Sequence, residues 1–198
     1  LRVEADGAIK QEIGLPAGLL AGQSRFGLEG ITMVGTGEDR MLVAAMQREW
    51  GDDPKGQVKL VAYKPASKEW SAVRYPLDAA ASGWVGLSEI TAYGDRLYIV
   101  DRVNQFGVAA RINRLYSVRV EVFRPAAVDA DLPLVEKTLE RDFIPDLKAA
   151  TNGYIVDKVE GFTVDAAGQA FVVTDNDGVD GSSGETLFLS LGTLAASN

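Results

Sequence analysis

The chain has 198 residues with 20 basic and 28 acidic side chains, giving a net charge of −8. It contains neither histidine nor cysteine, which excludes Ser-His-Asp triads, imidazole metal sites, thiol nucleophiles and disulfide bonds. Any catalytic site must therefore use carboxylates, hydroxyls, guanidinium groups or an oxygen-ligated metal. Because the basic residues are few and dispersed, we expect no nucleic-acid partner. Since no apolar run approaches about 18 residues, we expect no membrane span.

Three segments of the chain share one design: a short apolar strand, a turn rich in Gly and Asp, and a second strand that ends in polar residues. A third strand follows in each unit, and a fourth follows in the first two units, at 70–75 and at 134–139. The first strands of the three units lie at 28–32 (LEGIT), 87–91 (LSEIT) and 159–163 (VEGFT). Four antiparallel strands that repeat as a unit are typical of propeller blades.

We therefore predict an all-β fold, a single β-propeller domain of four-stranded antiparallel blades over residues 1–198, with about three and a half blades. The predicted parts are the end of a preceding blade at 1–16 and blades at 26–77, 86–140 and 158–192. Residues 124–133 are predicted to be a loop and residues 145–150 a short helix. An incomplete ring exposes strand edges, so we expect an upstream part of the same protein or a second copy to complete it.

Residues 26–32 (FGLEGIT), and above all 158–163 (KVEGFT) followed by 172–178 (VVTDNDG), resemble the esterase-like phytase family of bacterial proteins. The resemblance covers residues 1–191 and matches the C-terminal part of family members. It implies a β-propeller, an exported protein that is periplasmic or secreted, and a hydrolase that acts on a small-molecule phosphate ester or related ester. The alternative is a non-catalytic propeller that binds a ligand or a protein, because this fold hosts both roles.

Glutamates in the predicted innermost strands point to a site on the propeller axis. Glu29, Glu89 and Glu160 are predicted to converge and to bind calcium, a cation that takes oxygen ligands, and Glu29 and Glu160 are also candidate catalytic residues. In the repeat alignment, however, Ser88 rather than Glu89 matches Glu29 and Glu160, and an offset of one residue turns a side chain to the other face of a strand. Alternatively, Glu29 and Glu160 pair with backbone amides or arginines and tie the blades together.

The densest cluster of oxygen ligands is the run 175–181 (DNDGVDG). We predict Asp175 and Asp177 as calcium ligands and Asn176 as a substrate contact. The run departs from the pattern of helix-flanked calcium loops, and the alternative is a turn rich in Asp and Asn.

Two arginines are the candidate phosphate ligands, because a guanidinium group presents a planar fork to two phosphate oxygens. Arg48 and Arg102 are predicted at equivalent places just after the second strands of their blades, where the third blade carries Asn176. We predict both arginines to bind substrate and to take part in catalysis, with calcium polarising the ester. Alternatively, they are solvated or form salt bridges with neighbouring carboxylates.

Overall fold

The computed structural model describes residues 1–156, 158–176 and 186–194. Its described residues form antiparallel sheets with little helix, which confirms the all-β prediction, and the sheets do not close into a barrel. The two α-helices, α1 (Ala17–Leu20) and α2 (Ile144–Ala150), are short. Neither has the length and apolar character that a membrane-spanning helix needs, and the described residues contain no other candidate.

Three sheets follow one another along the chain, after an N-terminal hairpin of β1 (Arg2–Val3) and β2 (Ile9–Gln11). The first sheet has the order β10-β6-β5-β4-β3, the second β11-β9-β8-β7, and the third β12-β13-β14. The first sheet contains β3 (Leu28–Val34), β4 (Met41–Met46), β5 (Gln57–Lys64), β6 (Glu69–Pro76) and β10 (Ala126–Ala127). The second contains β7 (Val85–Tyr93), β8 (Arg96–Val103), β9 (Asn113–Arg119) and β11 (Thr138–Asp142). The third contains β12 (Val159–Val164), β13 (Gln169–Thr174) and β14 (Phe188–Thr193).

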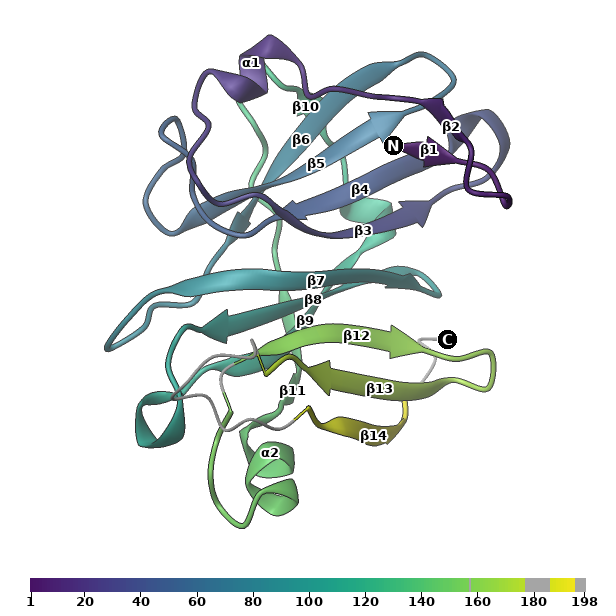
Figure 1. Ribbon diagram of the computed structural model, residues 1–198. Helices are drawn as coiled ribbons and strands as arrows, with labels where there is room; N and C mark the ends of the chain where they lie inside the picture. The colour runs from purple at the N-terminus through teal and green to yellow at the C-terminus, as the bar shows by residue number, and fades with distance from the viewer. Residues whose placement is uncertain (157, 177–185, 195–198) are drawn as a thin grey trace.

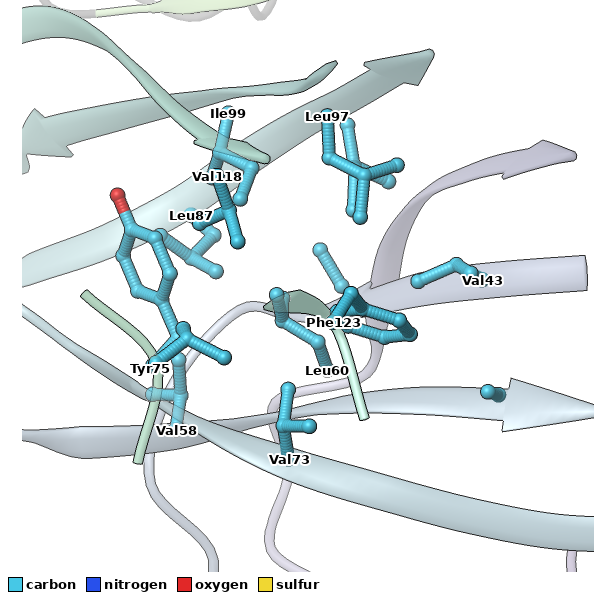
Figure 2. Packing of buried hydrophobic residues seen from close by; sticks show 14 of the residues in the cluster. Val43, Val58, Leu60, Val73, Tyr75, Leu87, Leu97, Ile99, Val118 and Phe123 are labelled. Atoms are coloured by element: carbon cyan, nitrogen blue, oxygen red, sulfur yellow. The ribbon is translucent and has the colours of Figure 1, made fainter. Parts of the chain in front are cut away.

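The second sheet lies between the other two (Figure 1). Successive residues of a strand face opposite sides of a sheet, and in β8 both sides are apolar. Leu97 and Ile99 pack in the core shared with the first sheet, whereas Tyr98 and Val100 pack in the core shared with the third. Figure 2 shows the first of these cores, in which Leu97, Ile99 and Val118 of the second sheet face Leu60 and Val73 of the first. A strand apolar on both faces belongs in the middle of a layered fold.

The first strands of the three sheets, β3, β7 and β12, lie next to one another. Polar side chains tie them together: the Ser88 hydroxyl donates to the Val159 carbonyl at 2.6 Å, and the Thr91 hydroxyl donates to the Phe162 carbonyl at 2.9 Å. Between β3 and β7, the Ala92 amide donates to the Thr32 hydroxyl at 2.9 Å. Each sheet therefore places the beginning of its first strand on a common edge of the molecule.

One segment of the second unit crosses to the first sheet, and here two predictions were wrong. Residues 120–137, which we call the strap, leave β9, add β10 to the outside of β6 and return to β11. The predicted loop 124–133 therefore contains a strand. The predicted strand at 134–139 is also divided, because the Arg74 carbonyl accepts from the Val135 amide at 2.9 Å and holds this end of the strap on β6. Only from Thr138 does the chain join the second sheet, since the buried Val135 packs in the core between the first two sheets.

Candidate functional site

The first strand of every sheet carries a β-bulge at the same place. The pairing register shifts between Leu28 and Gly30, between Leu87 and Glu89, and between Val159 and Gly161. The extra residues are therefore Glu29, Ser88 and Glu160. This confirms the repeat alignment, in which Ser88 and not Glu89 corresponds to the two glutamates. A bulge changes the direction of the side chains around it, and here it does so three times at one level of the fold.

The common edge of the three sheets contains a hollow of about 440 Å³, which we call the rim hollow. It combines residues at the beginnings of first strands with residues at the ends of second strands. The residues that line it are Arg25, Phe26, Gln47, Trp84, Arg102, Asn104 and Lys158. Three of them are cations, although acidic residues outnumber basic ones in the whole chain. A concave surface with this local charge favours an anionic ligand.

Arg102 is the buried cation of the rim hollow, with 3% of its surface exposed. Its Nη2 donates to Glu160 Oε1 at 2.5 Å, a contact that joins β8 of the second sheet to β12 of the third. Its Nε is buried and has no hydrogen-bond partner among the described residues. A buried donor without a partner is costly. The alternative of a salt-bridged arginine is thus observed, and the same arginine retains a free donor.

Glu160 is the carboxyl group closest to this cation. Burial raises the pKa of Glu160, and the nearby charge of Glu29 raises it further, whereas Arg102 and Lys158 oppose the shift. The Lys158 ammonium lies 3.8 Å from the same Oε1 that Arg102 contacts. A half-buried carboxyl whose pKa is raised by burial keeps its proton to higher pH than an exposed glutamate does, which suits a general acid.

Arg48 and Arg102 are not equivalent, which corrects the sequence prediction. The residue equivalent to Arg102 in the first sheet is Gln47. The Gln47 amide donates to the Gly27 carbonyl, and in the second sheet Arg102 pairs with Gly86, the residue equivalent to Gly27. Because bulges and loops of different length separate the strands, aligning the units by sequence alone misplaced the equivalent of Arg102 by one residue. Arg48 instead contacts Glu49 at 3.0 Å.

The Arg48 guanidinium also lies over two aromatic rings, 4.8 Å from the Trp84 ring centre and 5.3 Å from that of Phe26. Burial alone would raise the pKa of its partner Glu49, but hydrogen bonds from backbone amides and from Arg48 lower that pKa. The charge of Arg48 is therefore neutralised by an ionised carboxylate. The side chain supports the aromatic wall of the rim hollow rather than forming its anion-binding surface.

Hydrogen bonds to the backbone fix the two aromatic residues. The Trp84 amide donates to Asn104 Oδ1 at 2.8 Å, and the Asn104 amide donates back to the Trp84 carbonyl at 2.9 Å. On the other wall, Trp50 Nε1 donates to the Phe26 carbonyl at 2.7 Å. The rings of Phe26 and Trp84 then meet edge to face at 5.4 Å. The wall is therefore held in place before any ligand binds.

The remaining glutamates lie apart from the rim hollow. Glu29 and Glu89 both line a neighbouring hollow of about 420 Å³ beside β3. Glu89 Oε1 accepts from the Ile90 amide at 2.7 Å, and burial raises the pKa of Glu89 even though the amides of Ile90 and Phe162 oppose the shift. Glu89 thus fits the structural role of joining neighbouring strands, while Glu29 is exposed.

The predicted calcium ligands do not assemble within the part of the chain that the structure describes. No group of three acidic side chains there could hold a metal ion. Asp175 and Asn176 follow β13, and the Asp175 amide donates to the Lys158 carbonyl at 2.8 Å, which brings the end of β13 to the edge that carries the rim hollow. Asp177 lies outside the described residues.

Sequence reasoning missed two cations of the rim hollow, Arg25 and Lys158. Each stands just before the first strand of its unit, where a search for repeats within strands does not look. Their position just before a repeated first strand could have identified them, since Lys158 immediately precedes the VEGFT strand on which the family resemblance rests.

A second polar cluster lies between the first two sheets, on the side of β8 away from Arg102. Asp101, which is fully buried, accepts from the Tyr75 hydroxyl at 2.7 Å and from the Lys137 ammonium at 2.6 Å. Lys137 also contacts Asp78 at 2.8 Å, and Asp78 accepts from Arg114 at 2.6 Å. Because Lys137 ends the strap, these contacts fasten the strap to both sheets.

A known protein family matches most of the chain. The model of the phytase-like family, described as esterase-like activity of phytase, matches residues 1–178, which include all residues that line the rim hollow. The chain belongs to the phytase-like family. Membership favours a hydrolase-type activity on a small molecule. No curated protein and no solved structure gave a significant match.

Proposed function

We propose that this phytase-like chain binds and hydrolyses a small anionic ester, with a phosphate ester as the preferred class, at the rim hollow. The observation that carries the proposal is the grouping of Arg25, Arg102 and Lys158 around one hollow, beside the half-buried carboxyl of Glu160. Guanidinium and ammonium groups bind phosphate oxygens through charge-assisted hydrogen bonds. The family supplies the hydrolase class, and the hollow supplies the preference for an anion.

Each residue has a distinct role in the proposed reaction. Arg102 and Lys158 hold the anionic group, because both residues line the hollow. Water attacks phosphorus, the bond from phosphorus to the ester oxygen breaks, and the proton of Glu160 passes to the departing oxygen. The attacking water becomes a hydroxyl group of the phosphate product, and its second proton returns to Glu160. Trp84 and Phe26 flank the organic part of the substrate, and Arg48 is a positioning residue that keeps Trp84 in place.

Purified protein incubated with p-nitrophenyl phosphate and p-nitrophenyl acetate tests this proposal. We expect turnover of the phosphate ester, a raised KM in Arg25→Gln and a lowered kcat in Glu160→Gln. Arg40→Gln, a change at an exposed arginine outside the hollow, is the matched control and should match the unchanged protein. Failure to hydrolyse either ester contradicts the hydrolase proposal.

The second candidate function is a non-catalytic module that binds an anion. It is favoured by the Arg102–Glu160 ion pair, because a Glu160 carboxylate that is ionised in this pair has no proton to give to a leaving group. Equilibrium titration with inorganic phosphate separates the two functions. Binding that Arg25→Gln weakens, without turnover of either ester, would support the module.

Calcium remains a prediction with no ligand set among the described residues. Glu160 is engaged by Arg102, and Glu89 by backbone amides, so these carboxylates do not fit a calcium site as arranged. No step of the proposed reaction depends on the ion. Equilibrium dialysis with calcium, with and without a chelator, tests whether the chain binds it at all.

We further propose that the three sheets are blades of a propeller and that the intact protein is exported. Adjacent first strands with bulges at one level support the blade arrangement, and the family resemblance supports export. The ring would be completed by an upstream part of the same protein or by a second copy. Light scattering of this chain reports a second copy as a doubled mass, and fractionation of the source cells locates the protein.

A further inference from the structure

Two hollows outside the rim hollow meet at one loop. One, of about 320 Å³, lies beside Val103 and Ile112, and the other, of about 410 Å³, lies beside Ala110 and Ile155. They share Val108 and Arg111, which belong to the loop between β8 and β9. Neither contains a residue that lines the rim hollow. We call the pair the paired hollow.

The floor of the paired hollow is apolar and firmly held. Val103, Ala110, Ile112 and Ile155 are buried members of the core shared by the second and third sheets. The loop above them is fastened by the Gly107 amide, which donates to the Ile155 carbonyl at 2.7 Å. A concave apolar surface that exists before binding is the usual form of a small-molecule site.

Two exposed cations stand at the rim, Arg111 in the loop and Lys148 in the last turn of α2. Neither side chain has a carboxylate or hydrogen-bond partner among the described residues. Arg141 behaves differently, since it forms two hydrogen bonds to Asp146 of α2. The only acidic residue of α2 is therefore already engaged, and no carboxylate of the described residues compensates Arg111 or Lys148.

We infer that the paired hollow binds a small amphipathic carboxylate. The alkyl chain would cover the apolar floor, and the carboxylate would contact Arg111 and Lys148. Val108, which is 92% exposed, would close over the chain. Burial of each further methylene adds to the binding free energy, so affinity rises with chain length, and the two cations require a negative head group. The exposed Phe106 and Tyr154 nearby are the kind of side chains that contact a lipid surface. A concave hollow whose floor belongs to the core, however, fits a single alkyl chain better than a bilayer.

Calorimetric titration with decanoate, below its micelle concentration, tests the inference. We expect saturable binding with one ligand per chain, weakened about tenfold by Arg111→Gln or Lys148→Gln through loss of a charge-assisted contact. Val108→Asp should also weaken binding, whereas Val122→Asp, at another exposed valine, should not. Acetate tests the need for the chain and decyltrimethylammonium tests the need for the negative charge, and neither should bind.

Three outcomes would overturn the inference. They are equal binding of decanoate and decyltrimethylammonium, unchanged binding in both Arg111→Gln and Lys148→Gln, and binding only to anionic phospholipid vesicles without binding of free decanoate. The inference does not rest on hydrolysis, because binding is measured directly. Inorganic phosphate should leave decanoate binding unchanged, which separates this site from the rim hollow.

Discussion

Arg102 of β8 donates a hydrogen bond of 2.5 Å to Glu160 of β12, and this contact connects two sheets next to the rim hollow. The arginine side chain is nearly inaccessible and the glutamate side chain is 23% exposed. Removing one partner of such a pair leaves a partly desolvated charge, whereas removing both does not. The pair therefore couples the stability of the fold to the charge of the site.

Arg102→Ala should lower the free energy of unfolding by about 3 kcal/mol, because Glu160 then loses its main partner. The double variant Arg102→Ala with Glu160→Gln should recover part of this loss. The exposed pair Arg119 and Glu121, at 3.0 Å, is the control, and its disruption should change stability by at most about 0.5 kcal/mol. Urea unfolding of the four proteins of the cycle measures the coupling, and strictly additive losses would contradict it.

Asp101→Asn should remove a pH dependence of stability. Burial raises the pKa of Asp101 from 3.8 to about 6, although Lys137 and Tyr75 oppose the shift. Between these two values the folded chain holds a proton that the unfolded chain releases, so the contribution of Asp101 to stability falls as pH rises from about 4 to 6 and is constant above.

Unfolding midpoints of the unchanged protein and Asp101→Asn across pH 4 to 8 measure this effect. The stability of the variant relative to the unchanged protein should rise up to a pH of about 6 and then level off. The pKa of neighbouring Asp78 is lowered, mainly by Lys137, Tyr116 and Arg114 acting against burial, so its titration lies below this window. Parallel curves for the two proteins would refute the prediction.

Tyr75→Phe should destabilise the protein by about 1–2 kcal/mol, because the buried hydroxyl donates to Asp101 at 2.7 Å and its loss leaves a buried acceptor with one partner fewer. It should also raise the pKa of Asp101, since a hydrogen bond to the ionised form is lost. Tyr116→Phe removes a hydroxyl that donates to the less buried Asp78, and we expect a smaller loss. Thermal unfolding ranks the two variants, and the reverse order would contradict this reading of burial.

Gly30→Ala should separate β3 from β7. A Cβ at this position would lie 2.7 Å from the Ile90 backbone nitrogen and 2.8 Å from Glu89 Oε1, and backbone atoms cannot yield as a flexible side-chain end does. We expect a loss of about 2 kcal/mol and faster hydrogen exchange at the β3 and β7 amides. Gly14→Ala, with no atom within 4 Å of the added Cβ, is the control. An equal effect of the two changes would show that the close approach is unimportant.

The strands and hairpins could be predicted because their signals are local. Gly94 adopts a left-handed conformation between β7 and β8, and Gly168 does so between β12 and β13, as the turn composition indicated. The strap could not be predicted in this way. Its β10 consists of two alanines, Ala126 and Ala127, whose strand structure depends entirely on pairing with β6. A pairing over more than 50 residues of sequence leaves no periodic signal.

The candidate site was predictable in kind rather than in detail. The sequence selected Arg102 and Glu160 as candidates, and the structure brings these two side chains into contact. Arg48 was placed one residue away from its true position, because loop lengths hide the register at strand ends. The direct contact between Arg102 and Glu160 depends on how neighbouring sheets pack, and no motif within a single unit contains that information.

The strap also makes the second sheet depend on the first. Val135 is held on β6 only three residues before β11 begins, so the native path into the outer strand of the second sheet requires the first sheet. Long loops that must close first slow folding. The third sheet consists only of neighbouring antiparallel strands and needs no such crossing. We therefore expect the first two sheets to unfold as one cooperative unit and the third to open separately.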